Sequence, residues 1–298
     1  MSGKATRDVT PNAANIIKAL EPLAHSRYNR RVFEDFVLLA EIVLERLPYT
    51  AGAILTGEQS DDGERAGEYQ ALVRGYKPAE LDCFAQAFGL LLRSAQSDGY
   101  DGDYDDLLGD VYMAWANPKP AAGQYFTPMP LCKAMAQMVM GDIEPLCRER
   151  VAAAIDAGPW GQMGFARGNR LAEPGREGAM LHALAAAYEH LKPVDVCDCA
   201  CGSGAMLLAA ASACPRWAVS YGVVRFWGQD IDLACARMAR VQLMLYGLNG
   251  YRLKLAAALH TQQAPQPVRW VAAPLAPPVA QPDITLPVAS GMQISMFG

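Results

Sequence analysis

The sequence predicts an α/β domain with a parallel sheet, preceded by a mainly helical region. After residue 180 the chain reads as strand, glycine turn, helix, strand, acidic turn and helix, over VDVCDCACGSGAMLLAAASA and then YGVVRFWGQDIDLACARMARVQLMLYGL. Two successive strand–helix units indicate a parallel sheet, because each pair of parallel strands needs a helical crossover. Before residue 120, apolar residues recur at helical spacing.

The clearest helix of the first region is Arg31–Leu47, whose apolar residues recur at intervals of three and four. We expect Pro48 to end this helix, because proline lacks the N–H group that the helical ladder needs. Further helices are expected from about Pro78, over Tyr104–Trp115, over Pro130–Met140, and over Ala179–His190 before the first strand.

The composition is that of a globular protein with a substantial core. Of the 298 residues, 52% are hydrophobic and 19% are charged, which excludes wholesale disorder. No apolar run reaches the roughly 18 residues of a membrane-spanning helix. The start, MSGKATRDVTPNAANIIKAL, lacks the basic-then-apolar pattern of a signal peptide. We therefore expect a cytoplasmic protein that does not associate with membranes.

The formal net charge of −5 limits how this chain can bind nucleic acid. Neutralising phosphates requires clustered lysine and arginine side chains. A mildly acidic chain therefore needs a local basic face or a partner protein to bind nucleic acid tightly.

Three of the eight cysteines alternate as C-x-C-x-C at Cys197, Cys199 and Cys201. This is not the paired C-x-x-C spacing of a zinc site, and nearby histidine ligands are lacking. Without a secretion signal, free thiols are favoured over disulfides. We interpret these cysteines as small buried side chains and expect no metal.

The strongest motif is the turn DCACGSG at Asp198–Gly204, between an apolar strand and an apolar helix. Glycines let the backbone approach a ligand closely, and the N-terminus of the following helix supplies N–H donors. The Asp198 carboxylate can accept hydrogen bonds from an ammonium group or from hydroxyls.

An acidic turn, Gly228-Gln229-Asp230-Ile231-Asp232, follows the second strand. In doubly wound nucleotide-binding folds, an acid roughly 20 residues or more past the glycine loop holds the ribose diol. The dinucleotide fingerprint G-x-G-x-x-G is absent, since Ala205-Met206-Leu207 follows Gly204. Asp198 would also repel a phosphate. The two motifs together predict a cofactor with adenosine and a cationic end, which describes S-adenosylmethionine.

Three motifs occur in one order: G-Q-Y-F-T-P at Gly123–Pro128, the glycine turn, and G-Q-D-I-D at Gly228–Asp232. They resemble the G-Q-F-F-T-P, D-P-A-C-G-S-G-G and G-Q-E-I-D motifs of N6-adenine DNA methyltransferases, in particular the methylation (M) subunits of type I restriction–modification systems. Asp106–Tyr112 is similar to the lead-in helix of that family. The resemblance covers roughly residues 100–250 and implies a Rossmann-like, S-adenosylmethionine-dependent methyltransferase domain.

The resemblance assigns roles to positions in this chain. It implies that Asp198 faces the amino group of the cofactor and that Asp230 holds the ribose hydroxyls. The positions that would flank the methionine end are Gln124, Tyr125, Phe126, Thr127, Pro128 and Met129. The cofactor-binding positions of the glycine loop would be Ala200, Gly202, Ser203, Gly204 and Ala205. Structural alternatives stay open, with Phe126 as a core residue, Gly202 as a turn and Asp232 as a helix cap.

Several positions depart from the family pattern. Cys199 replaces the loop proline, Ala205 replaces the last glycine, and Met129 stands where the family often has a basic residue. The link between the first two motifs is longer than usual, which implies an insertion over residues 142–180. The arginines of this insertion are interpreted as part of a solvated loop, with contact to DNA as the alternative: Arg167, Arg170 and Arg176.

The catalytic motif of the family, N-P-P-F or N-P-P-Y, does not occur in this sequence. In the family, its asparagine and a backbone carbonyl accept hydrogen bonds from the amino group of the flipped adenine, and its aromatic ring stacks on the base. The best positional counterpart is Val271–Ala276, which places Ala273 at the asparagine position and Ala276 at the aromatic position. We therefore assign no catalytic residue.

The domain boundaries follow from these motifs. We expect a helical region over residues 1–120, a methyltransferase-like domain with an incomplete sheet over 121–274, which includes one strand at Val268–Ala273, and a proline-rich tail over 275–298. Near the end, Gln293–Phe297 resembles the short peptide by which bacterial proteins dock on the DNA polymerase sliding clamp, although an ordinary apolar tail is the alternative.

Two functions follow from the resemblance. The first is an S-adenosylmethionine-binding homologue of site-specific DNA (adenine-N6) methyltransferases, acting on DNA with a partner specificity subunit. The second is a catalytically inactive methylase-like protein that binds or regulates restriction–modification or replication components. The absent N-P-P motif and the acidic net charge favour dependence on a partner. A methyltransferase acting on protein or small molecules is disfavoured by the G-Q-Y-F-T-P motif.

Overall fold

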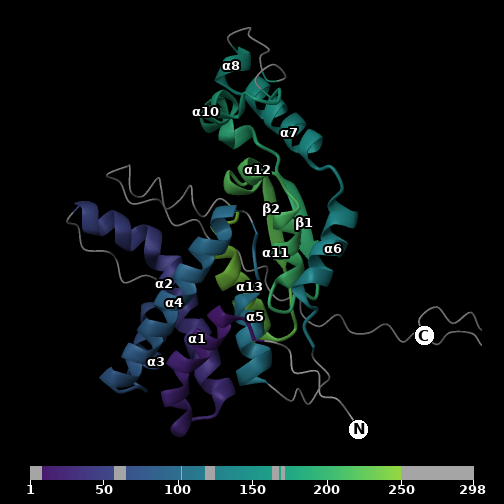
Figure 1. Ribbon diagram of the computed structural model, residues 1–298. Helices are drawn as coiled ribbons and strands as arrows, with labels where there is room; N and C mark the ends of the chain where they lie inside the picture. Colours follow the sequence, from purple (N-terminus) through teal and green to yellow (C-terminus); the bar gives the residue numbers. More distant parts are fainter. Residues whose placement is uncertain are drawn as a thin grey trace, which may run out of the picture. The chain divides into compact units, whose positions relative to one another are not determined.

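The computed structural model describes residues 9–56, 65–101, 103–117, 125–162, 168 and 172–249 (Figure 1). The chain divides into two units, Met1–Pro265 and Gln266–Gly298, and every described residue belongs to the first. Several sequence predictions therefore lie outside the described residues: Gln124, the two arginines Arg167 and Arg170, the strand Val268–Ala273 with its Ala273 and Ala276 counterparts, and the peptide Gln293–Phe297.

The first part of the chain is helical, as the sequence predicts. Its elements are α1 (Pro11–Leu20), the 3₁₀ turn η1 (Glu21–His25), α2 (Asn29–Thr56), α3 (Ala66–Val73) and α4 (Pro78–Asp101). The start of α1 has the expected local cause: Pro11 occupies the first turn, and the Thr10 hydroxyl accepts the Ala13 N–H at 3.4 Å.

Pro48 does not end its helix, and the prediction that it would is wrong. Helix α2 continues through Pro48 to Thr56. Proline removes one ladder hydrogen bond and costs about 3 kcal/mol inside a helix. Pro48 is buried, however, and Ala51, Ala53 and Leu55 beyond it are good helix formers. Burial of Pro48 and the helix propensity of the residues after it offset the local cost of the proline.

The helix expected at Tyr104–Trp115 is present but begins later. Helix α5 covers Leu107–Val111, and a π-helical turn, η2, continues it over Tyr112–Ala116. The later start has a specific cause, because the Asp106 carboxylate caps the helix by accepting the Gly109 N–H at 3.0 Å. Helix α6 then covers Met129–Met140, close to its predicted bounds.

The described residues of the expected insertion, residues 142–180, are largely helical. Its elements are α7 (Glu144–Ala157), α8 (Pro159–Gln162) and the start of α10 (Glu177–Ala187), which the turn η3 (Tyr188–His190) follows. Cys147, Val151 and Ile155 of α7 are fully buried. Arg176 does lie at the surface, where it pairs with Glu173 at 3.7 Å. The segment therefore contributes to the core.

Two strands form a small parallel sheet within this mostly helical structure. Strand β1 (Val194–Asp198) pairs in register with β2 (Val224–Gly228). Helices α11 (Ala205–Ser212) and α12 (Arg216–Ser220) lie between the strands in the chain, and α13 (Leu233–Leu245) follows them. The predicted order of strand, turn, helix, strand, turn and helix is confirmed. The larger Rossmann-like sheet stays a prediction.

The two faces of this sheet differ. Val194, Val196 and Phe226 point to one face, which α11 and α13 cover, as Figure 1 shows for α11. The opposite face carries Asp195 and Trp227, which are exposed and joined by a hydrogen bond of 2.8 Å from the indole Nε1 to the carboxylate. Side chains alternate between faces along a strand, so this division follows from the register.

Among the described residues, two large groups of buried apolar residues form most of the core. The sheet cluster includes Val151, Ile155, Leu184, Leu208, Val224 and Phe226. The helical cluster includes Ile16, Phe33, Phe36, Leu91, Leu108 and Tyr112. Helix α13 contributes to both, with Ala239 in the sheet cluster and Met238 and Val241 in the helical cluster. Among the described residues, no helix has the length and apolar character required to cross a membrane.

The burial of Ile155 tests whether residues 142–180 belong to the core. Ile155→Ala is expected to lower the free energy of unfolding by about 2–5 kcal/mol, because it leaves a cavity at a fully buried position. The control is Glu149→Ala, at an exposed position of the same helix, with a change within about 0.5 kcal/mol. Urea titration followed by circular dichroism measures both. Equal stability of the two variants would contradict the assignment of α7 to the core.

Candidate functional site at the carboxyl ends of the strands

The two predicted motifs lie side by side because the strands that precede them are paired. Asp198 and Gly228 are partners in the parallel ladder, so the turns after β1 and β2 begin next to each other. Backbone hydrogen bonds then join the turns: the Gln229 N–H donates to the Asp198 carbonyl at 2.9 Å, and the Cys201 N–H donates to the Gln229 carbonyl at 2.9 Å. The glycine loop and the acidic turn therefore form one unit.

Asp230 connects the acidic turn to the glycine loop through its side chain. One carboxylate oxygen accepts the Gly202 N–H at 2.8 Å, and the other accepts the Asp232 N–H at 2.8 Å. The residue is partly buried. Each oxygen has a second lone pair, so the fixed carboxylate can still accept hydrogen bonds from the hydroxyls of a ligand.

Two glycines of the loop have backbone conformations that other residues rarely adopt. Gly202 has φ +54° and Gly204 has φ +97°. A Cβ atom on Gly202 would lie 3.2 Å from the Phe126 ring, and one on Gly204 would lie 3.1 Å from the backbone of Ala239 in α13. Gly204 is the N-cap of α11 and provides no side-chain cap. The first N–H groups of α11 are therefore directed at the loop as hydrogen-bond donors.

The segment that follows Gln124 packs against the glycine loop. The Phe126 ring lies against Gly202 and stacks on Tyr112, with ring centroids 5.4 Å apart. Tyr125 is 73% exposed, and Thr127 and Pro128 are exposed as well. Met129 packs on the small group Cys132, Ala136, Ala205 and Ala209, which joins α6 to α11. The structure thus brings the first two motifs together, although about 70 residues separate them in the chain.

The remaining predicted positions differ in which of their groups a ligand could contact. Asp198 is partly buried, and one of its oxygens accepts the Ala200 N–H at 3.0 Å, while Ala200 itself is exposed. Ser203 is 1% exposed, and its hydroxyl donates to Asp106 at 2.6 Å. A ligand on the outside of the loop would therefore meet Ser203 through its backbone. Asp232 caps α13 by accepting the Ala234 N–H at 2.9 Å, as the structural alternative predicted.

Ile231 is a feature of the site that the sequence did not single out. It lies between Asp230 and Asp232 and is fully exposed at 103%. A large apolar side chain so exposed, directly beside a fixed carboxylate, is a surface on which a flat apolar ring can pack. The only sequence signal for Ile231 was its place between two aspartates. This pattern is not specific for a binding site, because turns after strands also carry it where no ligand binds.

The cysteines do not all behave as predicted. Cys201 is buried beneath Gly228, whereas Cys197 and Cys199 are exposed, so the interpretation of all three as buried side chains is wrong for these two. Cys197 points to the uncovered face of the sheet, and Cys199 lies on the outside of the turn. Burial, followed by the charges of Asp230 and Asp198, raises the pKa of Cys201 to about 12. This thiol is therefore neutral at physiological pH and is no nucleophile.

Within the described ranges, no group of three or more His, Cys, Asp or Glu side chains is close enough to hold a metal ion.

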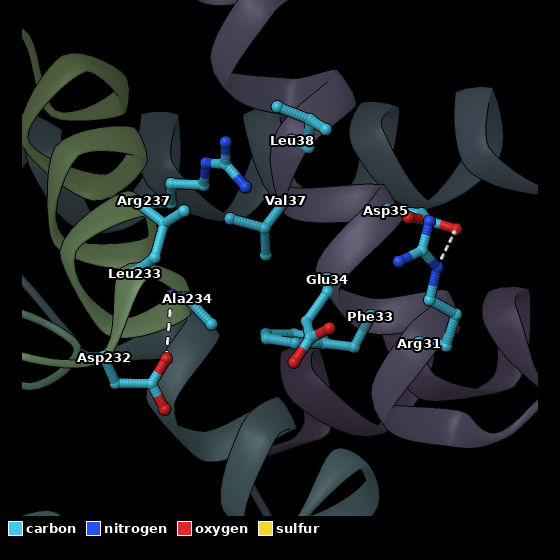
Figure 2. Close-up of a pocket in the computed structure, with 10 residues that line it drawn as sticks. All are labelled: Arg31, Phe33, Glu34, Asp35, Val37, Leu38, Asp232, Leu233, Ala234 and Arg237. Carbon is cyan, nitrogen blue, oxygen red and sulfur yellow. Dashed lines mark hydrogen bonds and ion pairs between the residues drawn. The ribbon is translucent and has the colours of Figure 1, made fainter. Parts of the chain in front are cut away.

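A shallow groove lies between α2 and the start of α13 (Figure 2). Its apolar part includes Val37, Leu38 and Leu233. Its arginines are paired with carboxylates, Arg31 with Asp35 at 3.1 Å and Arg237 with Glu41 at 3.5 Å. Because these charges are balanced, the groove is not a phosphate-binding surface, and the candidate site remains at the strand ends.

A parallel strand–helix–strand unit with a glycine turn after one strand and an acid after its neighbour is the arrangement that doubly wound proteins use for adenosine-containing ligands. Residues 180–274 match the family described as N-6 DNA methylase. The match begins in α10 and includes both strands, the glycine loop and α13. No curated protein and no solved structure matches the chain.

Gly204 allows a test of the loop conformation. Gly204→Ala is expected to lower the free energy of unfolding by about 1–3 kcal/mol, because φ +97° strains an alanine and its Cβ meets the Ala239 backbone at 3.1 Å. Gly89→Ala is the matched control: it lies in α4, where nothing lies within 4 Å of the added Cβ, and it should be neutral or stabilising by up to about 1 kcal/mol. Chemical denaturation measures both, and equal effects would contradict the loop geometry.

Proposed function

We propose that this chain binds S-adenosylmethionine on the turns that follow β1 and β2, as the cofactor-binding part of a DNA N6-adenine methylation system. The observation that carries the proposal is the Asp230 carboxylate, which is held against the glycine loop through the Gly202 N–H at 2.8 Å. It supplies a fixed acceptor for ribose hydroxyls beside the N-terminus of α11.

The charges of the site favour this cofactor over a nucleotide phosphate. Asp198 and Asp230 both border the loop, and carboxylates repel phosphate while attracting the cationic amino and sulfonium groups of S-adenosylmethionine. In this proposal Ile231 packs on the adenine ring. The methionine end lies toward residues 124–129, and the backbone of Ala200 and of Gly202–Ala205 lines the remainder.

Methyl transfer on this site needs no covalent enzyme intermediate. Bound there, S-adenosylmethionine would supply an electrophilic methyl group for direct transfer to adenine N6, with S-adenosylhomocysteine as the leaving group and the N6 proton passing to solvent. The protein contributes orientation and electrostatic stabilisation. The raised pKa of Cys201 agrees with this chemistry, because a neutral buried thiol does not compete for the methyl group.

The residues that grip the adenine are proposed to come from outside this chain. Ala273 and Ala276 stand at the positions of the asparagine and the aromatic residue of the family. Alanine can neither accept a hydrogen bond from the amino group through its side chain nor stack on the base. The second candidate function is therefore a methylase-like binding or regulatory partner, which the same two alanines favour.

Binding of the cofactor can be tested at Asp230. Asp230→Ala is expected to weaken S-adenosylmethionine binding roughly 10- to 100-fold, the effect of losing a charged hydrogen-bond acceptor. Asp195→Ala is the control, because Asp195 lies on β1 but points to the opposite, exposed face, and its affinity should remain within about twofold. Isothermal titration calorimetry on the full chain measures both. A wild-type chain that binds no cofactor, or an Asp230→Ala variant that binds equally well, would overturn the proposal.

Methyl transfer is the second test. The purified full chain, given DNA and S-adenosylmethionine with a tritiated methyl group, is expected to leave the DNA unlabelled, because Ala273 and Ala276 cannot position an adenine. Co-purification with its restriction–modification partner subunits should restore labelling, and this labelling should be lost with Asp230→Ala. Labelling by the chain alone would contradict the proposed dependence on a partner. Labelling that survives Asp230→Ala would contradict the assignment of the cofactor site.

A further inference from the structure

Three polar side chains are buried together behind the glycine loop. Asp106, Ser203 and Gln242 are 3%, 1% and 1% exposed. They come from three parts of the chain: the N-cap of α5, the glycine loop and the middle of α13. Burying a carboxylate is costly unless its oxygens are hydrogen-bonded. A buried carboxylate with hydrogen-bond partners, in contrast, holds those partners in fixed positions.

Hydrogen bonds join the three side chains to one another and to the backbone of α5. One oxygen of Asp106 accepts the Ser203 hydroxyl at 2.6 Å, and the other accepts Gln242 Nε2 at 2.9 Å and the Gly109 N–H at 3.0 Å. Gln242 Nε2 also donates to the Ser203 carbonyl at 2.8 Å, and its Oε1 accepts the Leu108 N–H at 3.1 Å. Ser203 is thus held through both its side chain and its backbone.

Gly109 shows how closely the carboxylate fits. A Cβ atom at Gly109 would lie 2.1 Å from an oxygen of Asp106, a distance that no real contact allows. The capping turn therefore requires a glycine three residues after the aspartate. The spacing Asp106-Leu107-Leu108-Gly109 is a consequence of this contact.

The segment before α5 is anchored to the helices around the site. The Tyr104 N–H donates to the Ser212 hydroxyl of α11 at 3.3 Å. The Asp105 N–H donates to the Tyr246 hydroxyl at 3.2 Å, and that hydroxyl donates to the Asp105 carbonyl at 2.9 Å. Lys133 of α6 forms an ion pair with Asp105 at 3.2 Å. The backbone that carries Asp106 is therefore held in place, so that its side chain can fix the position of the loop.

We propose that Asp106 is a positioning residue for the cofactor loop: by holding Ser203 from behind, it fixes the backbone of Gly202–Ala205 in the conformation that receives the cofactor. The inference rests on the proposed function, since it assigns a role in binding S-adenosylmethionine. The role is geometric. Asp106 does not contact the cofactor, because Ser203 lies between it and the outside of the loop.

The Asp106→Asn variant distinguishes the effect of the hydrogen bonds of Asp106 from the effect of its negative charge. In Asp106→Asn, the side-chain oxygen can still accept from Gly109 and Gln242, while the amide donates to the Ser203 hydroxyl, which can also act as an acceptor. The hydrogen-bond framework is therefore retained without the charge. Asp106→Ala removes the framework and the charge together.

A matched control exists on α2. Asp35 is 5% exposed and accepts a tyrosine hydroxyl, that of Tyr76, at 2.6 Å. Asp35→Ala therefore removes a buried carboxylate with a hydroxyl partner at the same distance, but away from the glycine loop. The Asp35→Ala variant therefore shows how much a loss of stability alone changes ligand binding.

The experiment measures S-adenosylhomocysteine binding to the full chain by calorimetry, and amide hydrogen exchange over residues 199–205 without ligand. Asp106→Ala should weaken binding at least tenfold and speed exchange in the loop. Asp106→Asn should bind within about threefold of wild type, and Asp35→Ala within about twofold, both with wild-type exchange in the loop. If Asp106→Ala does not fold, Ser203→Ala carries the test, with binding about fivefold weaker and faster exchange.

The outcomes separate this inference from the proposed function. A wild-type chain that does not bind overturns both. A wild-type chain that binds, with folded Asp106→Ala binding equally well, overturns the positioning role alone. Binding of Asp106→Asn as weak as that of Asp106→Ala also overturns it, because the charge and not the framework would then be required.

Discussion

Asp198 and Gly228 are partners in the parallel ladder of β1 and β2, and the arrangement of the candidate site follows from this register. Two turns that begin next to each other can exchange backbone hydrogen bonds, and the Asp230 carboxylate can reach the Gly202 N–H. A shift by one residue would move every side chain of a strand to the opposite face of the sheet. Val196 and Phe226 would then leave the core, so apolar burial enforces the register that the site needs.

The glycine loop is supported from two sides by different forces. Outside, the Phe126 ring lies against Gly202 and connects the loop to Tyr112 of the helical cluster. Behind, Asp106 and Gln242 hold Ser203 in a buried network whose hydrogen-bonding groups have defined partners. Helix α13 serves both core clusters and also supplies Gln242. The conformation of the loop thus depends on the N-terminal helices as well as on the sheet.

Much of this structure could be predicted from local patterns, and the failures share one cause. The strand–turn–helix order, the glycine loop, the acidic turn and the Asp232 cap follow from periodicity and turn chemistry. Pro48 was expected to end its helix and Cys197 to be buried, and both expectations are wrong, because the state of these residues depends on what packs against them. The local cost of a proline in a helix and the usual preference of a small apolar side chain for burial can both be overridden by the tertiary structure.

The sequence by itself determined the match of residues 180–274 to the N-6 DNA methylase family model and the identity of the groups at the site, since spacing and residue type fix which atoms a strand-end turn can present. Only the tertiary structure decided which of these groups face outward. Ser203, a natural candidate for a ligand contact, turns its hydroxyl inward to Asp106, while Ile231 is left fully exposed beside Asp230. The reason is that a buried carboxylate must find donors, and one donor to Asp106, the Ser203 hydroxyl, comes from a distant part of the chain.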